Sequence, residues 1–366
     1  MTVAITSPSL NVDNNVSGIS SIVKTIIDYN KSVTYIHLIA GKTDNEKSSY
    51  KRFYSIIQSY RKLIKLLTKN SFDLLHLNLA LNAKSIYRDY VTFRLCRLFN
   101  RNIIVHLHGG RYLQEKPKFF TFNIIRNILT NANKVVALSL FEKTTIENLY
   151  NITNVKVLPN AVDTNVYRLT NTHKNFDKLK FLFMGRLHES KGVEIIIKAF
   201  ETLVKKGYKI ELLICGNGPL KDLVQRKAEE NVDINYGGTI LGKAKIDIMN
   251  ECDVFLLPSL YGEGMPMALL EAMACGLVPI VSTDGSMKYI IEDSNNGFLV
   301  KKNSVPDLVD KMEMVIKNIS LLSVISANAI DTITSNFGIS DYLHNLNGLY
   351  EYSRISTEEL VCVDPQ

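Results

Sequence analysis

Two glutamates stand eight residues apart in the stretch G-E-G-M-P-M-A-L-L-E-A-M-A-C-G of this 366-residue chain. Pro266 suits the first position of a helix, where a missing N–H is harmless, and Gly276 suits the position just past a helix end. The pattern therefore predicts a short helix over residues 266–275. Glu263 would lie in the loop before that helix, and Glu271 would lie on the helix itself.

This arrangement suits a ligand that carries a diphosphate between two hydroxyl-bearing ends. The backbone N–H groups of Gly264 and Met265 are expected to point out of the helix N-terminus, where unpaired donors and the helix dipole favour a diphosphate. The two carboxylates can accept hydrogen bonds from hydroxyls on either side of it. A glutamate pair alone is more often a solvated helix face, so the sugar-nucleotide site that these residues predict needs support from neighbouring motifs.

Three further motifs precede the glutamate pair, each at the end of a predicted strand. They are Gly185-Arg186 with Lys191, the run Cys215-Gly216-Asn217-Gly218-Pro219, and Tyr236-Gly237-Gly238. Together with the Glu-x7-Glu pair they resemble, in kind and order, the signature of the retaining glycosyltransferases of family 4. The resemblance covers nearly all of the second half of the chain strongly and the first half more loosely.

The resemblance implies the α/β fold known as GT-B, in which two Rossmann-like, doubly wound domains face each other across a cleft. We expect an acceptor-binding domain at residues 1–168 and a nucleotide-sugar donor domain at residues 169–338. Residues 339–366 are expected to form a helix that crosses back to the first domain. Ligands of open α/β sheets bind beyond the C-terminal ends of the strands, which agrees with motifs that follow strands.

Family 4 enzymes transfer a sugar from a nucleoside diphosphate with retention of anomeric configuration, without a metal or another cofactor. By resemblance, Glu263 binds and orients the donor sugar, and Glu271 holds the ribose hydroxyls. Arg186 and Lys191 stabilise the leaving diphosphate, where charge develops in the transition state. The loops that border the base contribute four residues, Gly216, Asn217, Thr239 and Ile240. The donor is a UDP- or GDP-sugar, and these residues do not distinguish the two bases.

The first half of the chain supplies two further candidates. Gly18 corresponds to a family glycine in a loop that approaches the donor phosphates, although a plain helix N-cap at Ser17 explains the same residues equally well. His108 follows a predicted strand and abuts two glycines, so we prefer it to His106 as the histidine that contacts the donor sugar in related enzymes. A structural role for a lone histidine is the alternative.

Short apolar runs alternate with helical patterns along the chain, which predicts parallel sheets with crossover helices in both halves. In the first half the predicted strands are 3–6, 33–39, 73–78, 102–106, 134–138 and 155–158, and the predicted helices are 19–29, 50–68, 86–99, 120–129 and 140–148. In the second half the predicted strands are 180–184, 211–215, 233–236, 253–257, 279–282 and 297–300. The polar stretch 170–178 is expected to link the halves.

The composition, 46% apolar and 22% charged, is typical of a soluble globular protein. The five cysteines lack the spacing of metal ligands, which favours reduced thiols in a cytosolic protein. No apolar run reaches the length of a transmembrane helix, and Met1 leads straight into a predicted strand. We therefore expect a cytoplasmic protein that can associate with the inner face of the cell membrane.

Charge is divided unevenly along the chain. Residues 1–165 carry 22 basic and 10 acidic side chains, whereas residues 166–366 carry 21 basic and 26 acidic side chains. Much of the basic excess lies in residues 42–69, where eight basic and two acidic residues are interleaved with four aromatic rings. Such a helix can lie on an anionic membrane, but an amphipathic helix with a solvated basic face fits equally well. No nucleic-acid-binding motif accompanies the charge, so nucleic acid is not an expected partner.

The acceptor is expected to bind loops of the first half, where residues 111–127 form a basic and aromatic rim suited to a polymeric or lipid-linked glycan. This favours assembly of a surface polysaccharide on a lipid carrier. One alternative is a related enzyme with a small soluble glycoside as product. Another is a non-catalytic module that binds sugar nucleotides, although the intact charged motif residues disfavour it. A nicotinamide-dependent oxidoreductase is disfavoured because no G-x-G-x-x-G follows the first strand.

Overall fold

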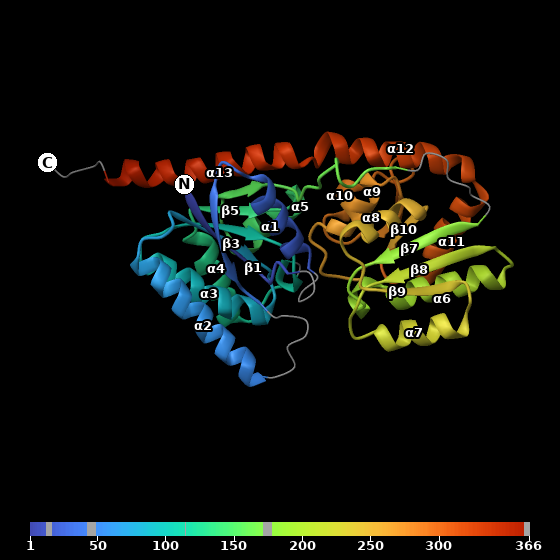
Figure 1. Cartoon of the computed structure of the whole chain (residues 1–366), viewed down its shortest axis with the longest axis horizontal. Helices are drawn as coiled ribbons and strands as arrows, with labels where there is room; N and C mark the ends of the chain where they lie inside the picture. The colour runs from blue at the N-terminus through green and yellow to red at the C-terminus, as the bar shows by residue number, and fades with distance from the viewer. Residues whose placement is uncertain (12–16, 42–48, 114, 171–177, 362–366) are drawn as a thin grey trace. The chain divides into compact units, whose positions relative to one another are not determined.

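The computed structural model describes residues 1–11, 17–41, 49–113, 115–170 and 178–361, and the chain forms two compact units. The first unit consists of Met1–Asn160 and Ser340–Gln366, and the second of Ala161–Ile339. Both are drawn in Figure 1. The structure divides the chain after Asn160, whereas the sequence places the domain boundary after residue 168.

A parallel six-stranded sheet, in the order β2-β1-β3-β4-β5-β6, forms the centre of the first unit (Figure 1). Its strands are β1 (Thr2–Ser7), β2 (Thr34–Ile39), β3 (Leu74–Leu79), β4 (Asn102–Leu107), β5 (Lys134–Ala137) and β6 (Val155–Val157). The chain adds β2 on one side of β1 and β3 on the other, so the sheet is doubly wound, as predicted. β3 is buried along its whole length, as expected of a central strand that helices cover on both faces.

The helices of the first unit bury one apolar face each. They are α1 (Gly18–Tyr29), α2 (Ser49–Thr68), α3 (Ala83–Leu98), α4 (Phe119–Thr130), α5 (Leu140–Tyr150) and α13 (Ile339–Val361), with a 3-10 turn, η1, at Arg111–Leu113. On α13 the buried residues Tyr342, Leu346 and Tyr350 recur every four positions, which places them on one side of the helix. On the described part of α2, Leu63 and Leu67 are buried.

The second unit also has a parallel six-stranded sheet, in the order β12-β11-β10-β7-β8-β9. Its strands are β7 (Leu179–Met184), β8 (Ile210–Cys215), β9 (Ile234–Gly238), β10 (Val254–Leu257), β11 (Val278–Ser282) and β12 (Phe298–Val300). Its helices are α6 (Val193–Lys205), α7 (Lys221–Glu230), α8 (Gly242–Glu251), α9 (Met267–Ala274), α10 (Met287–Ile290), α11 (Val305–Lys317) and α12 (Ile319–Asn336), with a 3-10 turn, η2, at Glu189–Lys191. Loops that follow β7, β8, β9 and β10 therefore emerge at one edge of one sheet.

The cysteines and the lengths of the described helices can be compared with the expectations from the sequence. Cys96, Cys215, Cys252 and Cys275 are buried, and none of them forms a disulfide with another described residue; Cys362 lies outside the described residues. Within the described ranges, no single helix combines the length and hydropathy needed to cross a bilayer, and α11 with α12 meets that test only as a pair bent by 105°.

Candidate functional site

The strand ends of the second unit are held together by close backbone contacts. Gly216 follows β8 with φ +143°, and a Cβ built on it would lie 1.8 Å from the carbonyl oxygen of Gly185 after β7. Gly192 ends the η2 turn with φ +72°, and a Cβ there would lie 2.3 Å from the carbonyl oxygen of Pro258 after β10. Only glycine fits at either point. The loops that carry Arg186, Lys191 and the glutamate pair are thus fixed against one another.

Glu263 is a buried carboxylate in the loop after β10. Its Oε1 accepts hydrogen bonds from the Ser259 hydroxyl at 2.5 Å and from Lys191 Nζ at 2.5 Å. Its backbone N–H donates to Asp284 Oδ2 at 3.1 Å, and Asp284, itself buried, pairs with Lys302. A buried carboxylate is tolerated only when it is paired and hydrogen-bonded, and here both conditions are met. The structure therefore brings two of the predicted site residues, Lys191 and Glu263, into direct contact.

Glu271 is the second buried carboxylate, on α9. Lys245 of α8 donates to its Oε2 at 2.5 Å, and the Tyr167 hydroxyl also bonds to it. Burial, with the adjacent Glu271 carboxylate, raises the pKa of Tyr167. The two glutamates thus lie at opposite ends of the loop-helix segment, each with its own lysine.

The helix between the glutamates begins one residue later than predicted. Pro266 is its N-cap, with φ −68° and ψ 119°, and α9 covers Met267–Ala274. The extended ψ of Pro266 keeps it out of the helix, so the prediction of Pro266 as the first helical residue is wrong. Gly264 and Met265 are buried in the loop before the cap. The first unpaired N–H groups that belong to the helix are those of Met267 and Ala268.

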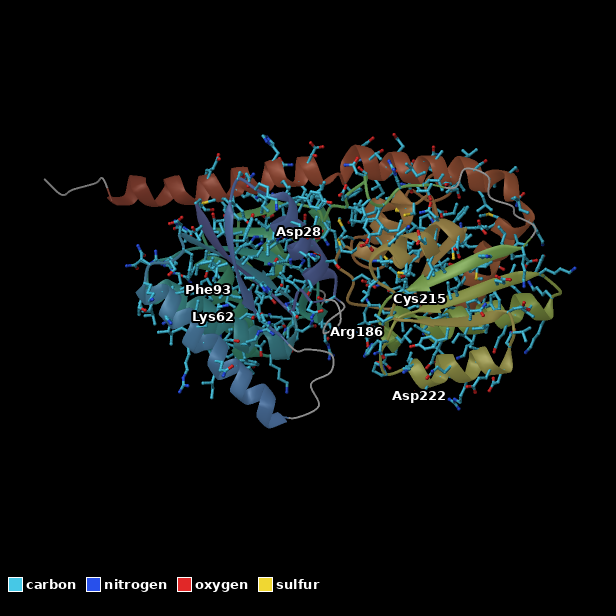
Figure 2. All side chains as sticks on the ribbon, in the orientation of Figure 1. Asp28, Lys62, Phe93, Arg186, Cys215 and Asp222 are labelled. Carbon is cyan, nitrogen blue, oxygen red and sulfur yellow. The ribbon has the colours of Figure 1, made fainter. Side chains whose placement is uncertain are left out.

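The remaining candidates of this unit lie on the loops after β7, β8 and β9. Arg186, which is labelled in Figure 2, is exposed. Its guanidinium forms no ion pair with another described residue. Asn217 is exposed next to Gly216, and its Oδ1 accepts a hydrogen bond from the backbone N–H of Gly218 at 2.8 Å. Thr239 and Ile240 follow β9, the first exposed and the second half-buried. These residues lie at the same edge of the sheet as the loop that carries Glu263.

Gly18 and His108 belong to the first unit. Gly18 is the exposed first residue of α1, and Ser17 is the N-cap, whose hydroxyl accepts a hydrogen bond from the Ser20 N–H at 3.1 Å. Residues 14–16 of the expected glycine loop lie outside the described residues. The capping geometry agrees with the structural alternative for this loop, and the phosphate role of Gly18 stays a prediction.

His108 is half-buried at the end of β4. Its Nε2 lies 2.6 Å from Oδ1 of Asn78, at the end of the adjacent strand β3. Burial lowers the pKa of His108 to about 3, so the ring is neutral at ordinary pH. The histidine that we prefer from the sequence is thus placed at a strand end by a specific hydrogen bond.

His108 is the outer member of a column of buried rings. The His106 and His108 ring centroids are 4.5 Å apart, and His106 Nδ1 lies 3.2 Å from His76 Nε2. His76 Nδ1 lies 2.7 Å from the hydroxyl of Tyr350 on α13. Burial lowers the pKa of His76 to about 3 and that of His106 well below its usual value. The column is therefore neutral and links α13 to the centre of the sheet.

Sequence reasoning missed several partners of these candidates: Asn78, Ser259, Asp284, Lys245 and Tyr167. Asn78, Ser259 and Asp284 each end or closely follow a strand, and that position was a usable signal. Lys245 and Tyr167 gave no such signal because tertiary packing brings them to Glu271. Among the described residues, no group of three or more His, Cys, Asp or Glu side chains is arranged to hold a metal ion.

Two family models match the chain, one on each half. The model described as Glycosyltransferase Family 4 matches residues 34–166, and the model described as Glycosyl transferases group 1 matches residues 170–332. The UDP-Gal:alpha-D-GlcNAc-diphosphoundecaprenol alpha-1,3-galactosyltransferase of Escherichia coli is 24% identical over 331 residues, which are 82% of this chain and 81% of that protein.

Solved structures with the same arrangement cover almost the whole chain. Sucrose-phosphate synthase from Thermosynechococcus elongatus matches with a TM-score of 0.79 at 16% identity, over 96% of this chain and 98% of that one. Anabaena HepE, in complex with UDP-glucose, matches with a TM-score of 0.76 at 16% identity, over 96% of this chain and 99% of that one. At these identities the likeness concerns the fold, and it confirms the GT-B prediction.

Proposed function

From the premise that the chain belongs to the family 4 glycosyltransferases, we propose that it transfers a sugar from a UDP-sugar, with retention, to a lipid-linked glycan in surface polysaccharide synthesis. The observation that carries the proposal is the Lys191–Glu263 pair, held at 2.5 Å at the strand ends of the second unit. The names of the Escherichia coli relative and of the HepE complex support UDP over GDP.

The two carboxylates bind different parts of the donor. Glu263 already binds Lys191 and Ser259 through Oε1, which leaves Oε2 to accept hydrogen bonds from hydroxyls of the donor sugar. Glu271 accepts hydrogen bonds from the ribose hydroxyls while it is paired with Lys245. Carboxylates are strong acceptors for paired hydroxyls, and their burial fixes the direction of those bonds.

The cations act on the leaving group. Arg186 is exposed and binds the diphosphate directly, and Lys191 stands beside it while holding Glu263 in place. The bond from the anomeric carbon to the diphosphate oxygen breaks, and the acceptor oxygen bonds to that carbon on the same face. The acceptor proton passes to an oxygen of the departing diphosphate. Negative charge grows on the diphosphate during this step, so fixed cations lower the barrier without a metal ion.

We propose that the first unit, which binds the acceptor, associates with a membrane surface. Residues 84–130 carry nine basic and two acidic side chains. Among them Phe119 and Phe120 at the start of α4 are 83% and 67% exposed, beside the exposed Lys118. Exposed Arg61, Lys62 and Lys65 lie on α2. Aromatic rings and cations together favour an anionic lipid surface, which supports a lipid-linked acceptor at the cytoplasmic face.

A transfer assay tests the proposal. The purified protein is incubated with UDP-sugars and a lipid-diphosphate-linked sugar in anionic vesicles, with EDTA present, and the product is analysed by mass spectrometry and its anomeric configuration by NMR. The proposal predicts a lengthened lipid-linked glycan with the anomer of the donor. Transfer only to a soluble sugar, without vesicle binding, would favour a small soluble glycoside as product, and binding of UDP-sugar without any transfer would favour a non-catalytic module.

A further inference from the structure

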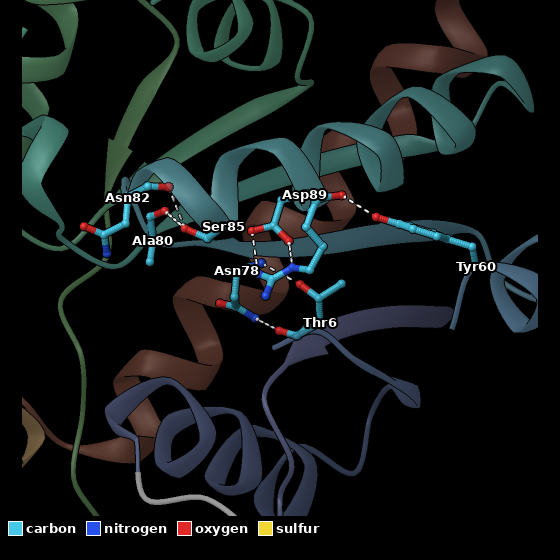
Figure 3. A network of polar contacts seen from close by, with 8 residues as sticks. Thr6, Tyr60, Asn78, Ala80, Asn82, Ser85 and Asp89 are labelled. Atoms are coloured by element: carbon cyan, nitrogen blue, oxygen red, sulfur yellow. Dashed lines mark hydrogen bonds and ion pairs between the residues drawn. The ribbon is translucent and has the colours of Figure 1, made fainter. Parts of the chain in front are cut away.

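Asn78 occupies a buried position at the C-terminal end of β3 and is tied to β1 through both its backbone and its side chain. Its backbone N–H donates to the Thr6 hydroxyl at 2.9 Å, and its Nδ2 donates to the Thr6 carbonyl oxygen at 2.8 Å (Figure 3). A backbone carbonyl can only accept, so the Thr6 contact fixes the direction of the Asn78 amide. The NH2 group faces β1, and Oδ1 faces β4.

That direction determines the protonation of the neighbouring ring. Asn78 Oδ1 is an acceptor and lies 2.6 Å from His108 Nε2, so Nε2 must carry a hydrogen. The half-buried His108 ring is neutral and therefore carries a single ring N–H. Nδ1 is then the bare nitrogen, with a lone pair, and no hydrogen bond joins it to any residue that the structure describes.

We propose that Asn78 is a positioning residue that holds His108 in the Nε2–H tautomer, so that Nδ1 accepts a hydrogen bond from a sugar hydroxyl. The Thr6 carbonyl, the Asn78 amide and the His108 ring form a directed chain across the ends of β1, β3 and β4. The tautomer follows from these contacts together with the neutrality of the ring, whereas the identity of the ligand rests on the proposed function.

The other neighbours of His108 hold the ring without setting its tautomer. His106 contacts it as a ring, with 33° between the planes, and the hydrogen bonds of the column run from His106 through His76 to Tyr350. Within the described residues, Asn78 is the one hydrogen-bonding partner of the His108 ring.

The tautomer is measured directly by long-range proton–nitrogen NMR on protein labelled with nitrogen-15 in histidine. His108 is assigned by its loss in His108→Gln. In the wild-type protein we expect a protonated Nε2 and a bare Nδ1. In Asn78→Leu, which removes Oδ1 at similar volume, we expect a mixture of tautomers. Thr6→Val is the matched control, because it removes the Thr6 hydroxyl but leaves the carbonyl contact, and it should keep the wild-type tautomer.

A protonated Nδ1 or a doubly protonated His108 ring in the wild-type protein at pH 7 would overturn the proposal, and that result does not depend on the folding of Asn78→Leu. An unchanged tautomer in folded Asn78→Leu would overturn it as well. These spectra need no substrate, so they stand even if the proposed transfer reaction is wrong.

Kinetics test the second half of the proposal. Asn78→Leu is expected to lower kcat for the complete UDP-sugar by about threefold to tenfold, the loss of one hydrogen bond, while the affinity for UDP alone stays the same. The double variant with His108→Gln should be no slower than His108→Gln alone, because Asn78 acts through His108. Additive losses, or a loss of UDP affinity in Asn78→Leu, would contradict a positioning role even where the tautomer agrees.

Discussion

The strand ends of the two units share an architecture but differ in their chemistry. In the second unit, buried carboxylates are matched with lysines: Glu263 with Lys191, and Glu271 with Lys245. In the first unit the hydrogen-bonded pair at the corresponding edge is neutral, with His108 bonded to the Asn78 amide. Parallel sheets bring loops together at this edge in either case, and the side chains decide whether the edge stabilises charge or accepts hydrogen bonds from hydroxyls.

The difference has an energetic side. Removing one partner of a buried ion pair leaves an uncompensated charge and costs about 3–5 kcal/mol, whereas a neutral hydrogen bond is worth about 0.5–1.5 kcal/mol. Substitutions in the second unit should therefore have large effects, and substitutions in the first unit small ones.

Lys191→Ala is expected to lower kcat/KM for the UDP-sugar by about 100-fold. It removes a cation that stabilises the leaving diphosphate and leaves the buried Glu263 without its lysine. Steady-state transfer rates measure the loss, and Lys205→Ala is the control, because Lys205 is an exposed cation on α6. A rate within twofold of wild type would remove Lys191 from the site.

The first unit should lose stability as the solution is acidified from pH 6.5 to 4.5. His76 and His108, with pKa values lowered to about 3, stay neutral in the folded state, but they bind protons in the unfolded state below about 6.5. The pKa of His106 is lowered as well, so this ring also binds a proton only in the unfolded state. The unfolded state then holds more protons, so the free energy of unfolding falls with falling pH.

Two buried carboxyls of the same unit oppose this trend. Burial raises the pKa of Glu142 to about 7, so this group holds a proton in the folded state, and burial also raises the pKa of Asp89. The unfolded state then binds a net excess of one to two protons. The free energy of unfolding is therefore predicted to fall by about 1.4–2.8 kcal/mol for each pH unit of acidification. Hydrogen exchange of β3 and β4 amides measures it, and protection that is constant or rises on acidification would show that the histidines are not buried and neutral.

The two glutamates should separate binding from turnover. Glu271→Gln is expected to weaken binding of free UDP by about tenfold, because the ribose hydroxyls lose a charged acceptor. Glu263→Gln should leave UDP binding intact and lower kcat with the complete donor. Calorimetry and transfer rates on both variants check the pair, and wild-type UDP affinity in Glu271→Gln would refute the ribose assignment.

Tyr350→Phe should have the smallest effect, a loss of about 1 kcal/mol in the stability of the first unit. It removes the hydroxyl that lies 2.7 Å from His76 Nδ1 and keeps the buried ring. Tyr352→Phe, on the exposed part of the same helix, is the control. Urea unfolding measures the difference, and a loss above about 3 kcal/mol would mean that the histidine column acts as more than a set of neutral hydrogen bonds.

Most of the fold could be predicted from the sequence because its signals are local. The predicted strands agree with those of both sheets to within two residues at each end, since each is a short apolar run bounded by polar residues. The start of α9 was wrong by one residue because Pro266 is equally suited to the N-cap and to the first turn. The helices α11 and α12 were not predicted, since no motif drew attention to them.

The site could be predicted only as far as its motifs reach. Glu263, Glu271, Arg186 and Lys191 belong to spaced motifs, and the contact of Lys191 with Glu263 joins residues that are 72 positions apart. No local pattern predicts that contact, or the one between Asn78 and His108, because both depend on which strands are neighbours in the sheet. The sequence indicated His108 through its glycines, but it did not indicate which ring nitrogen is bare.

The central claim is that the charged strand ends of the second unit bind a nucleoside diphosphate without a metal ion. Calorimetric titration of the wild-type protein with UDP, GDP and ADP in the presence of EDTA tests it most directly. The account predicts selective binding of UDP. Failure to bind any of the three, or binding that appears only when a divalent cation replaces EDTA, would contradict it.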